Sequence, residues 1–131
     1  WLPFMMEAHN SDVFLCSSNA VTEDGKLVNI DSTGNRVASM IFGPKQVIIV
    51  VGKNKIVRDV DAGLKRLKGV AGPLNAKRHK FVELPCVSTG LCTDCDSPKR
   101  ICRVITIMER APNRVRSPNI TVVLVAEDLG F

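Results

Sequence analysis

Four cysteines near the end of the chain have the types and spacing that could support metal chemistry. Cys92 and Cys95 form a C-x-x-C pair, and Cys86 and Cys102 flank the pair at distances across which a loop can fold back. Thiolates are soft, negatively charged ligands for zinc and iron, and a C-x-x-C pair can ligate one centre from a single turn. We therefore predict that the four sulfurs bind one metal ion or iron–sulfur cluster.

The spacing of the cysteines leaves the identity of the metal open. Ferredoxins repeat C-x-x-C tightly, whereas zinc ribbons separate two C-x-x-C knuckles by a longer insertion, and this segment follows neither pattern. The alternative is a metal-free loop whose thiols are free or form a chance disulfide. His79, beside Lys77 and Arg78, is expected to be a solvated surface residue and not a ligand. Cys16 lies in an apolar segment and is interpreted as a small core residue.

Composition and charge limit the other classes of function. A chain of 131 residues with 45% hydrophobic content fits one domain. Five cysteines, one of them isolated, form a poor disulfide framework, so we expect a reducing, cytoplasmic compartment. No apolar run approaches the roughly 20 residues needed to cross a bilayer.

The net charge of +5 suits a small anionic ligand better than nucleic acid, because the chain has no Tyr for stacking and its basic residues are spread thinly. Several of these residues are interpreted as the solvated face of a helix, namely Lys53, Lys55, Arg58, Lys65, Arg66 and Lys68.

The rest of the chain follows patterns typical of an α/β fold with a mostly parallel sheet flanked by helices. The apolar run within Gln46 to Val51 predicts a strand buried on both faces, as in a parallel sheet. Helical spacing of apolar residues from Ile56 to Leu67 predicts an amphipathic helix that stops near Gly69. In the first half of the chain we also predict a helix within residues 1–10, a strand at 13–16, a strand–turn–strand unit ending at 31, and a helix capped by Ser32 or Thr33 and ending near 43. In the second half we predict a helix at 73–79, a loop at 85–102, and strands at 104–108 and 120–126 joined by a basic loop at 110–118.

Polar residues beside two of these elements form a second candidate site. The backbone N–H groups of Ser17 to Ala20 and of Gly34 to Arg36 can converge on an anion, the second set at a helix N-terminus. Arg36 could then clamp a carboxylate or phosphate. The predicted ligand-binding residues are Ser17, Ser18, Asn19, Asp24, Gly34, Asn35 and Arg36. The alternative is that the Asn and Asp side chains of these loops only cap turns and satisfy one another.

Several longer motifs follow one another along the chain. They are S-N-A-V-T-E-D-G at 18–25, G-N-R at 34–36, P-L-N-A-K-R at 73–78, the four-cysteine segment, and E-D-L-G-F at 127–131. With these motifs the chain resembles the LUD-domain proteins, named for lactate utilisation, and in particular a stand-alone branch with a four-cysteine loop. The resemblance implies one LUD-like domain over residues 1–131, the C-terminal portion of a longer chain whose N-terminal part is missing.

The resemblance also implies a fold and a role. The fold is that of the CoA-transferase and ribose-phosphate isomerase group. The role lies near the oxidation of lactate to pyruvate, where relatives are components of an iron–sulfur and flavin-linked system. Together with the residues described above, this favours a redox-associated component of an oxidoreductase system. It would carry an iron–sulfur cluster or zinc on the cysteine loop, bind a small anionic ligand and act with a redox partner protein.

Two other functions remain open. Glu23-Asp24-Gly25 resembles the Glu-Asn-Gly motif that carries the nucleophile of CoA-transferases, so one alternative is a CoA-transferase or sugar-phosphate isomerase with Glu23 as its catalytic residue. The other alternative is a non-catalytic, zinc-stapled binding module, in which zinc has only the structural role of holding the cysteine loop together.

Overall fold

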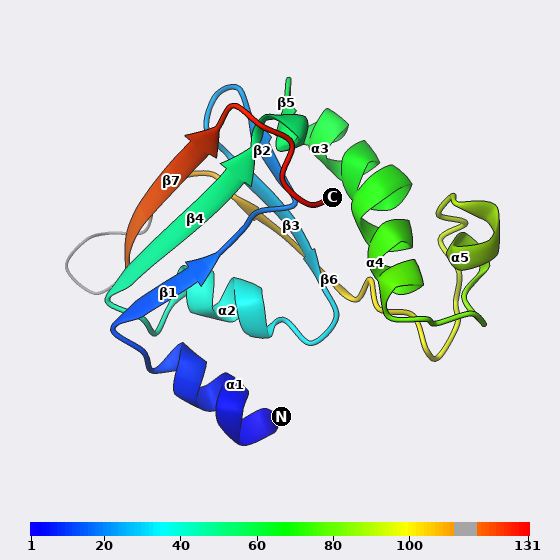
Figure 1. Ribbon diagram of the computed structural model, residues 1–131, viewed down its shortest axis with the longest axis horizontal. Coiled ribbons are helices and arrows are strands. Elements are labelled where there is room, and N and C mark those ends of the chain that lie inside the picture. The colour runs from blue at the N-terminus through cyan, green and yellow to red at the C-terminus, as the bar shows by residue number, and fades with distance from the viewer. Residues whose placement is uncertain (112–117) are drawn as a thin grey trace.

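The computed structural model describes residues 1–111 and 118–131, which form two sheets with helices around them (Figure 1). The strands are β1 (Val13–Cys16), β2 (Ala20–Thr22), β3 (Leu27–Asp31), β4 (Gln46–Gly52), β5 (Ile56–Val57), β6 (Val104–Met108) and β7 (Asn119–Val125). The helices are α1 (Leu2–His9), α2 (Asn35–Ile41), the 3-10 helix η1 (Lys53–Lys55), α3 (Val60–Arg66), the π-helix η2 (Leu67–Ala71), α4 (Gly72–Arg78) and α5 (Pro85–Thr89).

The predicted α/β class is confirmed, with a parallel sheet flanked by helices. This first sheet has the strand order β1-β4-β7, and β4 pairs in parallel with both neighbours. β4 is central and parallel as predicted, but the expected burial on both faces is wrong. Val47, Ile49 and Val51 are buried on one face, whereas Ile48 and Val50 on the other face are only half-buried. The second sheet has the order β5-β2-β3-β6 and is mostly antiparallel, since β2 and β3 form a hairpin and β6 pairs with β3. The sequence pattern did not separate this second sheet from the first.

Two hydrophobic cores hold these layers together. The first joins β4 to the second sheet and to α2, and its buried residues are Val21, Leu27, Val37, Met40, Val47, Ile49 and Val51. The second lies where β2 and β3 meet η2, and its buried residues are Ala20, Val28 and Leu67. The column of helices from α3 to α4 therefore packs beside the second sheet (Figure 1).

The other face of the parallel sheet, which we call the outer face, keeps apolar side chains in contact with solvent. Side chains alternate along a strand, so Val13 and Leu15 point away from the core that Phe14 contacts. The exposed fractions are 50% for Val13, 68% for Leu15 and 41% for Val123, which lies on the same face through its pairing with Val50.

Four of the predicted boundaries are wrong. The helix does not stop at Gly69, because η2 and α4 continue it to Arg78, and Gly69 does not adopt the positive φ that often ends a helix. Gly34, with φ of +81°, is the N-cap of α2, where the sequence predicted Ser32 or Thr33. The first five residues of the predicted cysteine loop form α5.

The helix predicted from Ile56 begins later, at Val60, because Ile56 and Val57 form β5. Asp59 caps this helix, since its carboxylate accepts the Ala62 N–H at 2.8 Å. Residues 112–117 of the predicted basic loop lie outside the described residues. In the part of the chain that the structure describes, no helix is both long and apolar enough to cross a bilayer.

Gly52 at the end of β4 allows the C-terminal segment to pass close by. A Cβ atom at this position would lie 2.5 Å from the Leu129 backbone nitrogen and 2.7 Å from the Glu127 carbonyl oxygen. Backbone atoms cannot swing aside as a flexible side chain does. We therefore expect Gly52→Ala to lower the free energy of unfolding by about 1–3 kcal/mol in urea titrations followed by far-UV circular dichroism.

The matched control is Gly69→Ala, where a Cβ atom would meet no atom within 4 Å. Alanine favours helical backbone over glycine, so this variant should be as stable as the parent or more stable. Equal losses in the two variants would show that crowding by the C-terminal segment is not the cause.

Candidate functional site

A cavity of about 510 Å³, here called the polar pocket, opens beside the loop that joins β1 to β2. Its volume lies in the range of sites for small organic ligands. Five of the predicted ligand-binding residues line it, namely Ser17, Ser18, Asn19, Asn35 and Arg36. Its other lining residues include Ile30, Asp31, Lys55, Arg78, His79, Ile101, Cys102 and Phe131.

The remaining predicted residues lie elsewhere. Glu23 and Asp24 are exposed in the hairpin turn between β2 and β3, where Asp24 accepts a hydrogen bond from Thr22 and pairs with Lys26 at 2.8 Å. The hydrogen bond from Lys26 lowers the pKa of Asp24. Gly34 is the N-cap of α2 and does not line the polar pocket. The catalytic role of Glu23 stays a prediction, and the structure places this residue outside the pocket.

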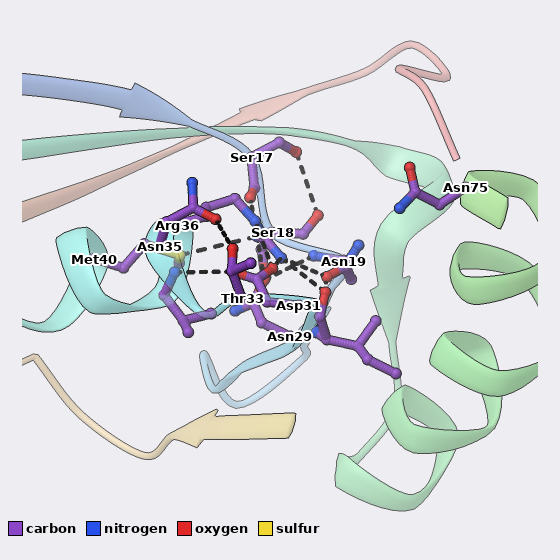
Figure 2. A network of polar contacts seen from close by, with 12 residues as sticks. Ser17, Ser18, Asn19, Asn29, Asp31, Thr33, Asn35, Arg36, Met40 and Asn75 are labelled. Atoms are coloured by element: carbon purple, nitrogen blue, oxygen red, sulfur yellow. Dashed lines mark hydrogen bonds and ion pairs between the residues drawn. The ribbon is translucent and has the colours of Figure 1, made fainter. Parts of the chain in front are cut away.

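Arg36, in the first turn of α2, reaches back to the loop between β1 and β2 (Figure 2). Its guanidinium donates to the Ser17 carbonyl at 2.6 Å, to Asn29 Oδ1 at 2.6 Å and to Asn19 Oδ1 at 2.7 Å. It also donates to Asp31 Oδ1, which lies 2.6 Å from Nη2 and 3.1 Å from Nε. All three nitrogens are therefore engaged by the protein, and Arg36 joins the loop, β3 and α2.

The start of α2, where the sequence predicts a bound anion, already faces a carboxylate of the chain itself. Asp31 Oδ2 accepts the Val37 backbone N–H at 3.1 Å, and the Asp31 side chain is 7% exposed. Asn19 is similarly committed, since its N–H donates to Asn29 Oδ1 and its Oδ1 accepts the Ile30 N–H. These contacts match the alternative in which Asn and Asp side chains of the loops satisfy one another.

Lys55 is a buried, charged residue of the polar pocket that sequence reasoning missed. It was interpreted as part of a solvated face, but it is 6% exposed, in η1 at the end of β4. Its Nζ atom donates to Ser17 Oγ at 3.1 Å. Burial lowers the pKa of Lys55, and the charges of Arg66 and Arg36 lower it further. Its place just after a buried strand was the signal that could have found it.

The four cysteines are brought together as predicted from their spacing. Cys86 on α5, Cys92 and Cys95 in the following turn and Cys102 before β6 all line one cavity of about 90 Å³, here called the thiol pocket. Each is half-buried with a free thiol. Burial raises the pKa of Cys86, and the negative charges of the other three thiolates raise it further.

The C-x-x-C turn is shaped by its own backbone and by one arginine. Asp94 has φ of +50°, and its N–H donates to Cys92 Sγ at 3.4 Å. The Arg100 guanidinium donates to the Cys95 carbonyl at 2.8 Å and to the Cys102 carbonyl at 3.2 Å. Arg100 thus ties the turn to the segment that carries the fourth cysteine.

The thiols do not form a tight site for one ion. Among residues 1–111 and 118–131, no group of three or more His, Cys, Asp or Glu side chains is placed to hold a single metal ion. The four cysteines instead line the thiol pocket, together with Leu67, Leu84 and Ile105.

The two pockets share part of their walls. Ile30, Gly72, Ile101 and Cys102 line both the polar pocket and the thiol pocket. One of the four thiol-bearing residues therefore faces the space in which a small ligand would lie.

Cys16 in β1 packs against the first core, which confirms its interpretation as a core residue. Burial raises the pKa of its thiol to about 11. At pH 8 the thiolate is therefore scarce, and we expect iodoacetamide to label Cys16 more slowly than the loop cysteines of metal-free protein, with a rate that rises as the pH approaches 11. Peptide mass spectrometry measures this, and rapid labelling of Cys16 at pH 8 would contradict it.

These features define an α/β domain with a ligand-sized polar pocket beside a loop of four thiols. The family model described as the LUD domain matches residues 3–125. The chain belongs to the LUD-domain family, which is associated with lactate utilisation. Comparisons with curated proteins and with solved structures found no match.

Proposed function

We propose that this protein is a redox-associated LUD-domain protein that holds an inorganic centre on its four-cysteine loop and binds a small carboxylate or phosphate ligand in the polar pocket. The observation that carries the proposal is the shared wall: Cys102 and Ile101 line both pockets. A ligand in the polar pocket would lie next to a residue that ligates the centre.

The donor set fits an iron–sulfur cluster better than zinc. Tetrahedral zinc requires every sulfur at about 2.3 Å from one point, and the described thiols are not gathered in this way. A cluster of several irons spreads its ligands around a larger body, as the four cysteines are spread around the thiol pocket. When bound, such a cluster supplies one-electron redox chemistry. Cys86, Cys92, Cys95 and Cys102 would hold it.

The surroundings of the loop support this assignment. Four thiolates in one small pocket repel one another unless a cationic centre lies among them, and metal binding relieves this repulsion. We place the protein in the reducing cytoplasm, where the thiols stay free, and we propose a redox protein as its partner.

Anaerobic purification of the full chain, followed by an absorption spectrum and by iron, sulfide and zinc analysis, tests the proposal. A broad band near about 400 nm with iron and sulfide is the expected result. Stoichiometric zinc without colour would replace the proposal with the zinc-stapled binding module. A sample with neither metal would reject a centre altogether.

A further inference from the structure

We infer that Lys55 binds the anionic group of the ligand in the polar pocket. This inference rests on the ligand-binding half of the proposed function and adds the residue and the charge that recognise the ligand. No part of the anion site predicted from the sequence included Lys55.

The first argument is the number of donors that Lys55 has left. An ammonium group carries three N–H donors and no acceptor. Lys55 is 6% exposed, and one donor is used by Ser17 Oγ at 3.1 Å. Among the described residues, no carboxylate lies within ion-pair distance of its Nζ atom. The remaining donors therefore need acceptors in the pocket that Lys55 lines.

The second argument is the balance of charge around the pocket. Arg66 donates to the carbonyls of Asn19 and Asn54, at 2.7 and 3.1 Å, and so brings a second positive charge to the loop between β1 and β2. Arg36 brings a third, and the one buried carboxylate beside it, Asp31, pairs with Arg36 itself. A buried positive charge without a counterion is costly, so the site favours an anion beside Lys55.

The third argument distinguishes Lys55 from the other cations of the pocket. Arg36 has committed all of its nitrogens to the protein. Arg78 is exposed, with its guanidinium carbon 5.4 Å from the centre of the Phe131 ring. Lys55 combines burial, charge and free donors.

The pocket also indicates the class of ligand. Its volume of about 510 Å³ is far larger than a bare ion requires, and Ile30 and Ile101 supply apolar wall. A Cβ atom on Gly130 would lie 3.6 Å from Lys55 Nζ, so the C-terminal segment passes beside the ammonium group. The ligand is a small organic acid or phosphate whose anionic oxygens contact Lys55 and the Ser17 hydroxyl, while its body extends toward Ile101.

Titration calorimetry on the full chain, with lactate and with inorganic phosphate as separate probes, tests the inference. The parent protein should bind at least one probe, and the probe that binds identifies the anionic group. Lys55→Met keeps the length of the side chain but removes its charge, and should weaken that affinity by about 10- to 100-fold. Lys53→Met, an exposed lysine of the same 3-10 helix, should leave it unchanged.

A second measurement separates binding from a structural role. Without ligand, Lys55→Met should melt at the same temperature as the parent or higher, because methionine removes an uncompensated buried charge. A lower melting temperature with unchanged affinity would assign Lys55 to the fold and overturn the inference. Lys55→Gln should show the same loss of affinity if Lys55→Met does not fold.

The remaining outcomes are distinct. If Lys55→Met and Lys55→Gln bind as tightly as the parent, or if Lys53→Met weakens binding equally, the inference fails and the proposed function stands. If the parent binds neither probe, the inference and the ligand half of the proposed function both fail. The metal analysis judges the four-cysteine centre independently of either result.

Discussion

Replacing Arg36 with methionine is expected to lower the free energy of unfolding by about 3–5 kcal/mol, because it leaves a buried partner charge without its counterion. Asp31 is 7% exposed and would lose the guanidinium that lies 2.6 Å from its Oδ1 atom. Asn19 Oδ1 and the buried Asn29 Oδ1 would each lose a donor. Urea unfolding followed by far-UV circular dichroism measures the loss.

The matched control is Arg58→Met. The Arg58 guanidinium is 81% exposed and pairs with Asp59 at the surface, so its removal should cause no measurable change in stability. Arg36→Lys should be destabilised too, since one ammonium group cannot reproduce the several directed bonds of a guanidinium. If Arg36→Met is as stable as Arg58→Met and loses anion binding, Arg36 is the ligand clamp predicted from the sequence and not a structural residue.

Replacing either Cys92 or Cys95 with serine is expected to remove most of the centre from anaerobically purified protein. Each residue supplies one of four thiolates around the thiol pocket, and a hydroxyl group is a poor substitute for a soft, anionic sulfur. Iron and sulfide per chain, together with the absorption near about 400 nm, should fall together.

The control for this pair is Cys16→Ser, because Cys16 lies in β1 and does not line the thiol pocket. It should retain the full content of iron and sulfide. Full metal in both loop variants would reject the assignment of the centre, whereas loss in Cys16→Ser as well would indicate damage to the fold.

Some elements were predictable because one local pattern determines them. The apolar run of β4 predicts a strand inside a parallel sheet, and β4 pairs in parallel with a strand on each side. The predicted stop near Gly69 was wrong. A glycine ends a helix where the chain needs a positive φ, and Gly69 does not adopt one. The chain instead continues into η2 and α4.

The candidate site also has a part that could be predicted from the sequence and a part that could not. The cysteines could be grouped from their spacing alone, since a short loop can bring nearby thiols together. The pairing of Arg36 with Asp31 depends on the turn at Gly34, whose positive φ lets α2 fold back on the end of β3. The burial of Lys55 depends on a short 3-10 helix between β4 and β5, which resembles the first turn of a solvated helix in its spacing of charges. Tertiary packing decides both.

The outer face of the parallel sheet affects which optical probes can follow this protein. Sheets of this kind usually have both faces covered, whereas here Leu15 and Val13 remain 68% and 50% exposed. A dye that fluoresces on apolar surfaces should therefore bind the native state and give a high signal before any heating. Trp1, the single tryptophan of the chain, is 92% exposed, so its emission should change little as the core opens.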